Sequence, residues 1–276
     1  MAAPTYKNKM NDSDSHFYDE KFFFNKNYLP SYNSAKEMVP MIISIFNPKS
    51  VVDLGCGSGT WLKAFKEFGV KNILGIDFHS IKPLISEREF FRHDLRKPLK
   101  LGKKFDIAIS LEVAEHIETR YSDIFVENLT RLSNKILFSA AIPKQEGENH
   151  INEQWHNFWV EKFEKRGYVA VDLMRSKIIL NNKISMDYRQ NTLLFIKKTI
   201  LKEEAIKLIP YYDKGRQFMH RKTYTKQFPL IYRFFYRLNN QVFHGLFEGF
   251  IDRLLLKKFF GDITTVKTDK LRLSKN

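Results

Sequence analysis

The sequence predicts an α/β protein built on a doubly wound, mostly parallel sheet of seven strands. Short apolar and β-branched runs alternate with helical stretches between residues 50 and 197, as in βαβ units on a parallel sheet. The run that ends at Leu54 breaks into a glycine-rich turn and continues as a helix, the form of a ligand-binding strand–turn–helix unit. A helical segment before the sheet and a basic, aromatic stretch after it complete the chain.

Each predicted strand is short, apolar and rich in β-branched or aromatic residues. The strands cover Ser50–Leu54, Asn72–Ile76, Glu89–Arg92, Phe105–Ser110, Lys135–Ser139, Val169–Met174 and Thr192–Ile196. Helical spacing of apolar residues predicts helices at Trp61–Phe68, Asp123–Leu132 and Glu153–Lys165. This order fits one Rossmann-like sheet with helices on both faces.

Two flanking segments differ from the sheet domain, which we place at residues 50–199. Residues 1–49 are expected to form an N-terminal helical lid, because Phe17–Phe46 is aromatic and compatible with a helix. Residues 200–276 are expected to form a basic aromatic helical extension, since Lys and Arg exceed Asp and Glu by nine from Lys202 onward. Its amphipathic stretch Pro229–Phe260 favours packing on the domain, a homodimer through these helices, or contact with an anionic membrane surface.

The composition is that of a folded protein, and its net charge allows an anionic partner without requiring one. Of 276 residues, 43% are hydrophobic and 28% charged, which excludes a disordered chain, and the net charge is +15. The single cysteine, Cys56, excludes an intrachain disulfide and a multi-cysteine metal site, and favours a cytoplasmic setting, with peripheral contact at the inner membrane surface as an option. The polar start, Met1–Asp14, predicts no signal peptide, and no apolar run is long enough to predict a transmembrane helix.

The glycine-rich turn lies in Val51–Trp61, where glycines allow the backbone to approach a ligand closely. Asp77 ends the second strand about 20 residues later, the position from which a carboxylate binds ribose hydroxyls. These two features predict a nucleoside ligand. The spacing Gly-x-Gly-x-Gly, with Thr60 in place of the third glycine of a dinucleotide site and Asp53 ending the first strand, argues against NAD.

These segments resemble the class I S-adenosylmethionine-dependent methyltransferases. Val51–Gly59 resembles their first motif, and Asp77 their second-strand acid. His93-Asp94-Leu95, Phe105–Ser110 and Leu111–Ile117 come next in the family's order, as the adenine-side segment, the fourth strand and its outgoing loop. The resemblance implies S-adenosylmethionine as cofactor, bound by Asp53, Gly55, Gly57, Gly59, Asp77, Asp94, Leu95, Ser110 and Glu112, with Glu112 at the methionine end.

The tip of the fourth strand and the segments after it narrow the choice of acceptor. Ser110–Val113 lacks the Asn-Pro-Pro-Tyr arrangement of enzymes that methylate amino groups of bases. Phe138–Pro143, His150–Trp155 and Tyr188–Phe195 resemble methyltransferases found with bacterial surface-polysaccharide and large-virus glycan genes, which implies O-methylation of a sugar or glycan hydroxyl. The alternatives are an RNA-directed methyltransferase, favoured by the net charge although nucleic acid is the less expected partner, a small-molecule O-methyltransferase, and a non-enzymatic cofactor-binding scaffold.

Methyl transfer to a hydroxyl needs a group that takes its proton. His150, in the polar loop after the fifth strand, is the first candidate for this base, and His116 is the second; either histidine alternatively has only a structural role in its loop. Glu153 binds the acceptor or favours the start of a helix. Asp94, Glu112, Glu115 and Glu153 offer carboxylates to a metal, but without a paired-aspartate motif after the fifth strand we expect none.

Overall fold

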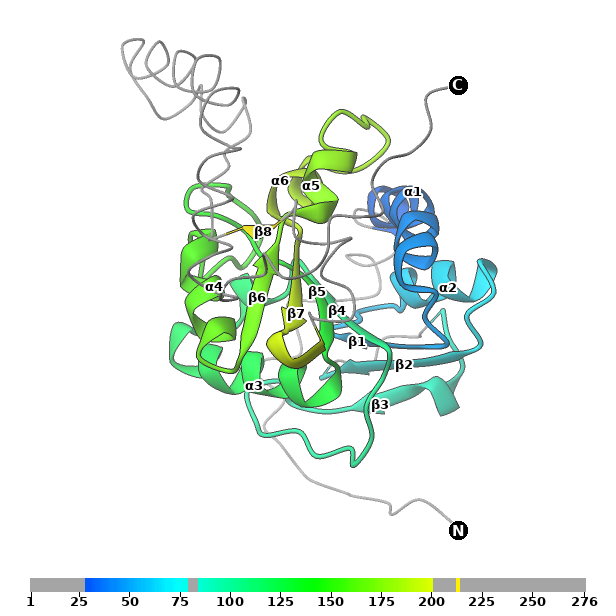
Figure 1. The fold of residues 1–276 in the computed structure, drawn as a ribbon, viewed down its shortest axis with the longest axis horizontal. Coiled ribbons are helices and arrows are strands. Elements are labelled where there is room, and N and C mark those ends of the chain that lie inside the picture. Colours follow the sequence, from blue (N-terminus) through cyan, green and yellow to red (C-terminus); the bar gives the residue numbers. More distant parts are fainter. Residues whose placement is uncertain (1–27, 79–83, 201–211, 214–276) are drawn as a thin grey trace, which may run out of the picture. The chain divides into compact units, whose positions relative to one another are not determined.

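The computed structural model describes residues 28–78, 84–200 and 212–213, all within the first of two units into which the chain divides, residues 1–220. Figure 1 shows one sheet with helices packed on it. Its strands are β1 (Ser50–Leu54), β2 (Asn72–Asp77), β3 (Phe90–Arg92), β4 (Ile107–Leu111), β5 (Lys135–Ser139), β6 (Tyr168–Val171), β7 (Leu193–Lys197) and β8 (Tyr212–Asp213). The seven predicted strands are confirmed, and the two-residue β8 adds an edge beside β6.

The strand order is β3-β2-β1-β4-β5-β7-β6-β8. Neighbours from β3 to β5 pair in parallel, whereas β7 is antiparallel to both β5 and β6. The mostly parallel, doubly wound sheet is therefore confirmed. The order reverses between β1 and β4, and a crevice at the carboxyl ends of the strands is expected at this switch point.

Six α-helices and four short 3₁₀ turns are described. The helices are α1 (Tyr28–Phe46), α2 (Thr60–Glu67), α3 (Ser122–Leu132), α4 (His156–Glu164), α5 (Leu173–Ile178) and α6 (Met186–Asn191), and the turns are η3 (Glu87–Glu89), η4 (Ala114–His116), η5 (Thr119–Tyr121) and η6 (Lys198–Ile200). The strand predicted to reach Met174 ends at Val171, and Leu173 begins α5. The helix predicted from Glu153 begins at His156, because Glu153 is engaged with the preceding loop.

Alternation along the strands builds two hydrophobic layers. Val51 in β1 faces the layer under α1, α2 and α5, and Val52 faces the layer under α3 and α4. The second layer contains the aromatic group Phe138, Phe163 and Phe195, in which the rings of Phe163 and Phe195 stack with centroids 3.9 Å apart. The sheet that carries the site is thus fixed from both sides.

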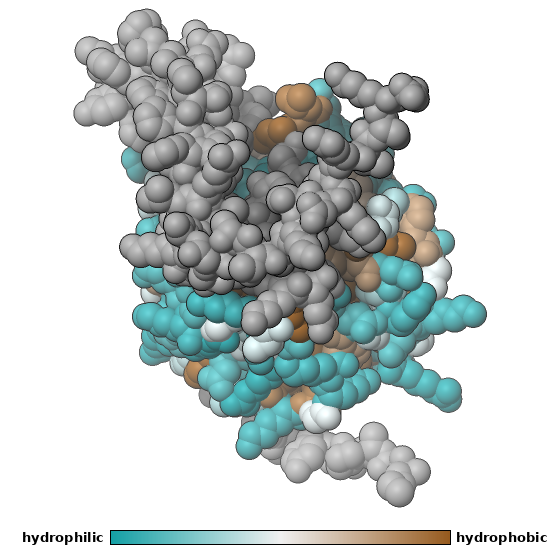
Figure 2. Space-filling view, viewed as in Figure 1, coloured by the Kyte–Doolittle hydropathy of each residue, from teal (hydrophilic) through white to brown (hydrophobic). Residues whose placement is uncertain are grey.

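Helix α1 packs into the hydrophobic core along most of its length instead of lying over the cavity as a lid would. Met38 and Ile42 are fully buried in the core, and only the start of the helix, at Pro30 and Ser31, borders the ligand cavity. Residues 1–27 of the predicted lid segment lie outside the described residues, as does the predicted extension apart from residue 200 and β8. The described surface in Figure 2 is mostly hydrophilic, with hydrophobic residues in small separate areas. Among the described residues, no helix is long and apolar enough to cross a membrane.

Candidate active site

The turn after β1 has the backbone that its glycines predict. Gly55 has φ +87°, and a Cβ there would stand 2.4 Å from a methyl carbon of Val113, so a side chain fits neither the conformation nor the space. The N–H of Gly57 donates to Oδ2 of Asp77 at 2.8 Å. This bond ties the turn to the carboxylate that ends β2.

Two acidic residues lie beside this turn. Asp53 is 3% exposed, and burial, followed by the negative charge of Asp77, raises the pKa of its carboxyl well above the usual range. Burial, followed by the charges of Asp77 and Asp53, raises the pKa of the Cys56 thiol. Cys56 is therefore an unreactive thiol in the core. The base of the site is therefore acidic and largely shielded from water.

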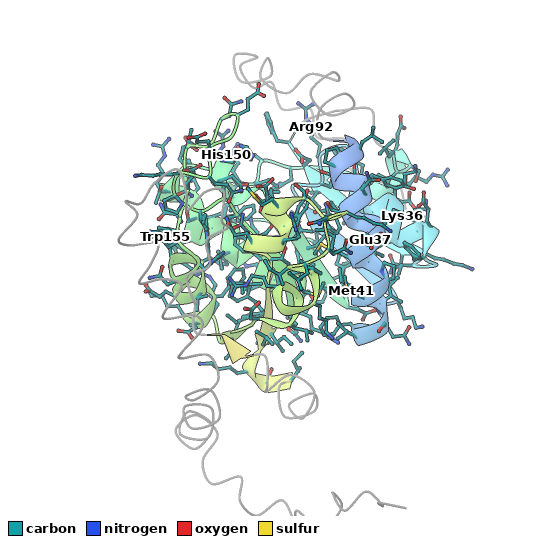
Figure 3. All side chains as sticks on the ribbon, turned by 90° about the horizontal axis from the view of Figure 1, so that it is seen from above. Lys36, Glu37, Met41, Arg92, His150 and Trp155 are labelled. Carbon is teal, nitrogen blue, oxygen red and sulfur yellow. The ribbon has the colours of Figure 1, made fainter. Side chains whose placement is uncertain are left out.

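A cavity of about 790 Å³ opens above the carboxyl ends of the strands. Most sequence-predicted site residues line it: Asp53, Gly55, Gly57, Asp77, Asp94, Leu95, Glu112, His116 and His150. In the view from above in Figure 3, His150 lies on one side of the molecule and helix α1, with Lys36 and Glu37, on the other. The cavity has walls from both sides, since Ser31 of α1 and His150 both border it.

Three predicted residues do not line the cavity. Ser110 is fully buried and its hydroxyl donates to the carbonyl of Leu54 at 2.7 Å, so it joins β4 to β1. Gly59 is the N-cap of α2, with φ +81°. Glu153 accepts the backbone N–H groups of Lys144 and Glu146 at 2.6 and 3.0 Å and thereby holds the loop that carries His150.

The predicted adenine side is built around Asp94. Its carboxylate accepts hydrogen bonds from the backbone N–H and the guanidinium of Arg96, at 2.9–3.3 Å. Burial raises the pKa of this carboxyl, but the bonds and charge of Arg96 outweigh burial and the net pKa is lowered. Asp94 is therefore ionised and fixed in orientation beside Leu95.

Glu112, which also lines the cavity, is held by amide side chains. It has φ +57°, and its carboxylate accepts from Nδ2 of Asn191 at 3.2 Å and from Nε2 of Gln145 at 3.3 Å. Gln145 also donates to Asp187 at 3.0 Å. Burial and the charge of Asp187 raise the pKa of Glu112 to about 7. The neighbouring carboxyl groups of Glu112 and Asp187 therefore favour a cationic group, such as the α-ammonium group of S-adenosylmethionine.

Sequence reasoning did not assign a site role to several residues of this wall. Gln145 and Asn191 hold Glu112, and Gln145 also binds Asp187. Tyr188 closes the wall through a 3.1 Å contact with the hydroxyl of Ser31 and an edge contact with Trp61. The one sequence signal for this wall was the stretch Tyr188–Phe195, which resembles glycan-associated methyltransferases, but that resemblance assigns no role to its polar residues. The contact between side chains of α1 and α6 could not be predicted because these helices are far apart in the sequence.

Glu115, His116 and His150 form a separate polar cluster at the rim. One nitrogen of each imidazole and one carboxylate oxygen of Glu115 lie within 4.8 Å of one another, an arrangement able to hold a metal ion. The imidazole rings meet edge to face with centroids 5.0 Å apart. Burial, followed by the charge of His150, lowers the pKa of His116 to about 4, so His116 is neutral at pH 7.

The described residues fit S-adenosylmethionine. The turn at Gly55 leaves space that a Cβ would fill, Asp77 and Asp94 provide carboxylates for a nucleoside, and Glu112 provides a negative charge for the amino-acid end. The cofactor supplies an electrophilic methyl group on a sulfonium. The protein's part is to bind it, to orient the acceptor and to take the acceptor's proton.

A family model described as a methyltransferase domain matches residues 34–169. No curated protein matches the chain. Solved structures similar to it include the methyltransferase domain of bacterial CtHen1-C, with 20% identity, TM-score 0.46, and coverage of 60% of this chain and 98% of that chain.

The names of two further similar structures include a substrate. The sugar N-methyltransferase KedS8 from Streptoalloteichus sp ATCC 53650 has 12% identity and TM-score 0.49, covering 72% of this chain and 98% of that one. Magnesium protoporphyrin IX methyltransferase from Synechocystis PCC 6803, with bound SAH, has 16% identity and TM-score 0.45, covering 63% and 87%. The match of residues 34–169 to a methyltransferase-domain model, with the folded glycine-rich turn inside this range, shows that this part of the chain is an S-adenosylmethionine-dependent methyltransferase domain.

Proposed function

We propose that the acceptor is a hydroxyl group of a sugar, in a glycan or a glycan precursor. The observation that carries this proposal is His150 at the rim of the donor cavity, with Nδ1 3.1 Å from Oε1 of Glu153. A carboxylate partner fixes the orientation of an imidazole and stabilises its protonated form. A sugar hydroxyl is hardly ionised at neutral pH, so it is the acceptor that most needs such a group.

The wall around His150 suits a polar acceptor. Glu146, Glu148 and Asn149 line the cavity beside it, and Glu118 also lies on its rim. A sugar offers several hydroxyl groups, each both donor and acceptor, and carboxylate and amide oxygens bind them well. The tip of β4, Ser110–Val113, presents no amide–proline pair for an amino group of a base. Both features favour an oxygen acceptor.

In this function, the role of each residue follows from its position in the cavity. Asp77, Asp94 and Glu112 hold the donor, and His150 or the cluster around it takes the proton from the acceptor oxygen. Alignment of donor and acceptor provides much of the rate, since methyl transfer is an in-line displacement. The cytoplasm is the proposed location, as the single cysteine favours.

The test is to incubate the purified protein with methyl-labelled S-adenosylmethionine and two pools from its source, surface-glycan precursors and total RNA. Label in the glycan pool that is lost in His150→Ala supports the proposal. Glu127→Gln, on the exposed face of α3, is the control and keeps full labelling. Label in RNA alone overturns the sugar assignment and favours the RNA-directed alternative. The net charge of +15 is compatible with that alternative.

A further inference from the structure

The backbone fixes the polar cluster at the cavity rim. Glu115 and His116 belong to η4, which comes shortly after β4, whereas His150 belongs to the loop before α4. The carbonyl oxygen of Glu115 accepts the N–H groups of both Ile151 and Asn152 at 2.9 Å. The two segments are therefore joined next to the three side chains, and the cluster is a built feature of the fold.

The buried carboxyl of Glu115 has no cationic partner among the described residues. Its side chain is 0% exposed, and the charge that acts on it is the like charge of Glu112. Two neighbouring carboxyl groups that are shielded from water are costly to keep ionised unless a cation lies beside them. A cation bound between Glu115 and the two histidines would remove this cost.

Both histidines are oriented as metal-binding histidines are. Nδ1 of His116 lies 3.2 Å from the carbonyl of Asn149 and must donate to it, so Nε2 is the nitrogen of this ring that can act as a ligand. Nδ1 of His150 lies 3.1 Å from Glu153, whose carboxylate also accepts from the backbone of Glu146. Carbonyl and carboxylate partners of this kind fix the ring and raise its basicity as a ligand.

We propose that Glu115, His116 and His150 bind a divalent transition-metal cation at the rim of the methyl-donor cavity. Two imidazoles and one carboxylate favour Zn²⁺, Mn²⁺, Fe²⁺ or Co²⁺ over Mg²⁺ and Ca²⁺, which prefer oxygen ligands alone. Three protein ligands leave a position open for an acceptor oxygen, as in catalytic zinc sites. The expectation from sequence that no metal binds rested on carboxylates alone and left out the two histidines.

The role of this cation, unlike the site itself, rests on the proposed function. A cation lowers the pKa of a hydroxyl bound to it. The sugar hydroxyl then releases its proton to water, its oxygen forms the C–O bond to the methyl carbon, and the S–C bond breaks with its electron pair remaining on sulfur. The products are a methyl ether and S-adenosylhomocysteine. With the cation bound, His150 acts on the hydroxyl through the metal instead of taking its proton directly, so His150→Ala loses labelling in either case.

The site is tested without any acceptor. The full-length protein is stripped with EDTA and titrated with Co²⁺, followed by its visible absorbance, and with Zn²⁺ by calorimetry. One equivalent is expected to bind, with weaker binding in Glu115→Gln and His150→Asn by more than the roughly 10–100-fold that loss of a supporting hydrogen bond costs. Glu127→Gln, which removes a charge paired with Arg131 on the exposed face of α3 and outside the cavity, is expected to leave the affinity unchanged. Binding of S-adenosylhomocysteine checks that each variant is folded.

The outcomes separate the site from its role. Absence of saturable binding to the wild-type protein, or equal binding to the Glu115→Gln, His150→Asn double variant, overturns the site. If the stripped enzyme labels glycan at the full rate, the cation has no part in transfer although the sugar assignment stands. If the cation binds and no glycan is labelled, the proposed function fails and the site stands.

Discussion

Nδ1 of His150 lies 3.1 Å from Oε1 of Glu153, and the same carboxylate accepts two backbone N–H groups of the loop before it. Glu153 therefore serves as a positioning residue: it orients the imidazole and ties down the loop, but does not border the cavity. This resolves the two readings of Glu153 that the sequence left open, since neither acceptor binding nor a helix start describes its contacts.

Replacing Glu153 by Gln tests that role. The amide keeps the size but loses the charge that favours Nδ1–H of His150, so we expect kcat to fall about 10–100-fold. KM for S-adenosylmethionine should not change, because the donor residues are untouched. Steady-state kinetics with the labelled acceptor pool measures both. An equal loss in kcat and in cofactor affinity would mean that Glu153 supports the whole cavity instead.

Gly147→Ala tests the same ring by steric means. A Cβ at Gly147 would stand 2.2 Å from both Cε1 and Nε2 of His150, so the ring or the loop must move. Misplacing a reacting group by about 1 Å costs about 100-fold in rate, and we expect turnover to fall by that order. Zinc affinity should fall with it if His150 is a ligand.

Gly102→Ala is the matched control for that substitution. Gly102 has φ +67°, and a Cβ at this position would have nothing within 4 Å, so the change strains the backbone without touching the site. It should cost about 1 kcal/mol of unfolding free energy and leave turnover unchanged. Urea denaturation and the labelling assay together check the pair. Full turnover in Gly147→Ala would show that His150 tolerates displacement.

The fold was predictable because its signals are local. The apolar run of β1 and the turn at Gly55 indicate the strand, the turn and the helix directly, and hydrophobic runs locate the remaining strands. Boundaries failed where a polar contact competes: Asp172 pairs with Arg175 at the start of α5, and the strand ends earlier than its apolar run.

The site was predictable only in part, because several of its residues are held by side chains from distant parts of the sequence. Asp77 and Glu112 lie at the ends of strands and were found from their order along the chain. Asn191 reaches Glu112 across 79 positions of sequence, and no local pattern indicates this contact. Ser110 lies near the end of β4, where site residues are expected, but its hydroxyl donates to the carbonyl of Leu54 and its side chain does not line the cavity.

Asp77→Asn is expected to weaken S-adenosylhomocysteine binding. The carboxylate organises the turn through Gly57 and carries the charge for ribose hydroxyls, and hydrogen bonds to charged groups contribute roughly 1.5–3 kcal/mol, or about 10- to 100-fold in affinity. Asp106→Asn is the control, since Asp106 also accepts backbone N–H groups, from Lys49 and Ser50, outside the cavity. Calorimetry should show a change in Kd for Asp77→Asn only. Equal affinities would remove Asp77 from the cofactor site.

The basic extension, which lies outside the described residues, carries a prediction from sequence alone. Arg253, Lys257 and Lys258 stand among large apolar residues, as in helices that bind anionic membrane surfaces. We expect the protein to co-sediment with phosphatidylglycerol vesicles at low salt and not with phosphatidylcholine vesicles. Replacing the three basic residues by Glu should abolish this binding and leave the catalytic domain folded. If the protein ignores anionic vesicles at low salt, packing on the domain or a homodimer is the better reading of the extension.

Asp53→Asn should stabilise the cofactor-free protein in a way that depends on pH. Burial, and then the charge of Asp77, raise the pKa of Asp53 in the folded state above its ordinary value of 3.8. The folded state thus holds the proton more tightly than the unfolded state, so this carboxyl favours folding below pH 3.8 and loses that contribution as pH rises toward the raised pKa.

Asparagine has nearly the same shape and no charge to bury, so the gain in unfolding free energy should be about 1–3 kcal/mol at about pH 8 and should shrink toward about pH 4. Urea denaturation of both proteins across this range, without cofactor, measures the difference. A loss of stability at the alkaline end would contradict the prediction and would mean that the ionised carboxylate holds the turn by accepting hydrogen bonds. In that case the negative charge at the base of the cavity is structural, and the cofactor binds a turn whose shape depends on it.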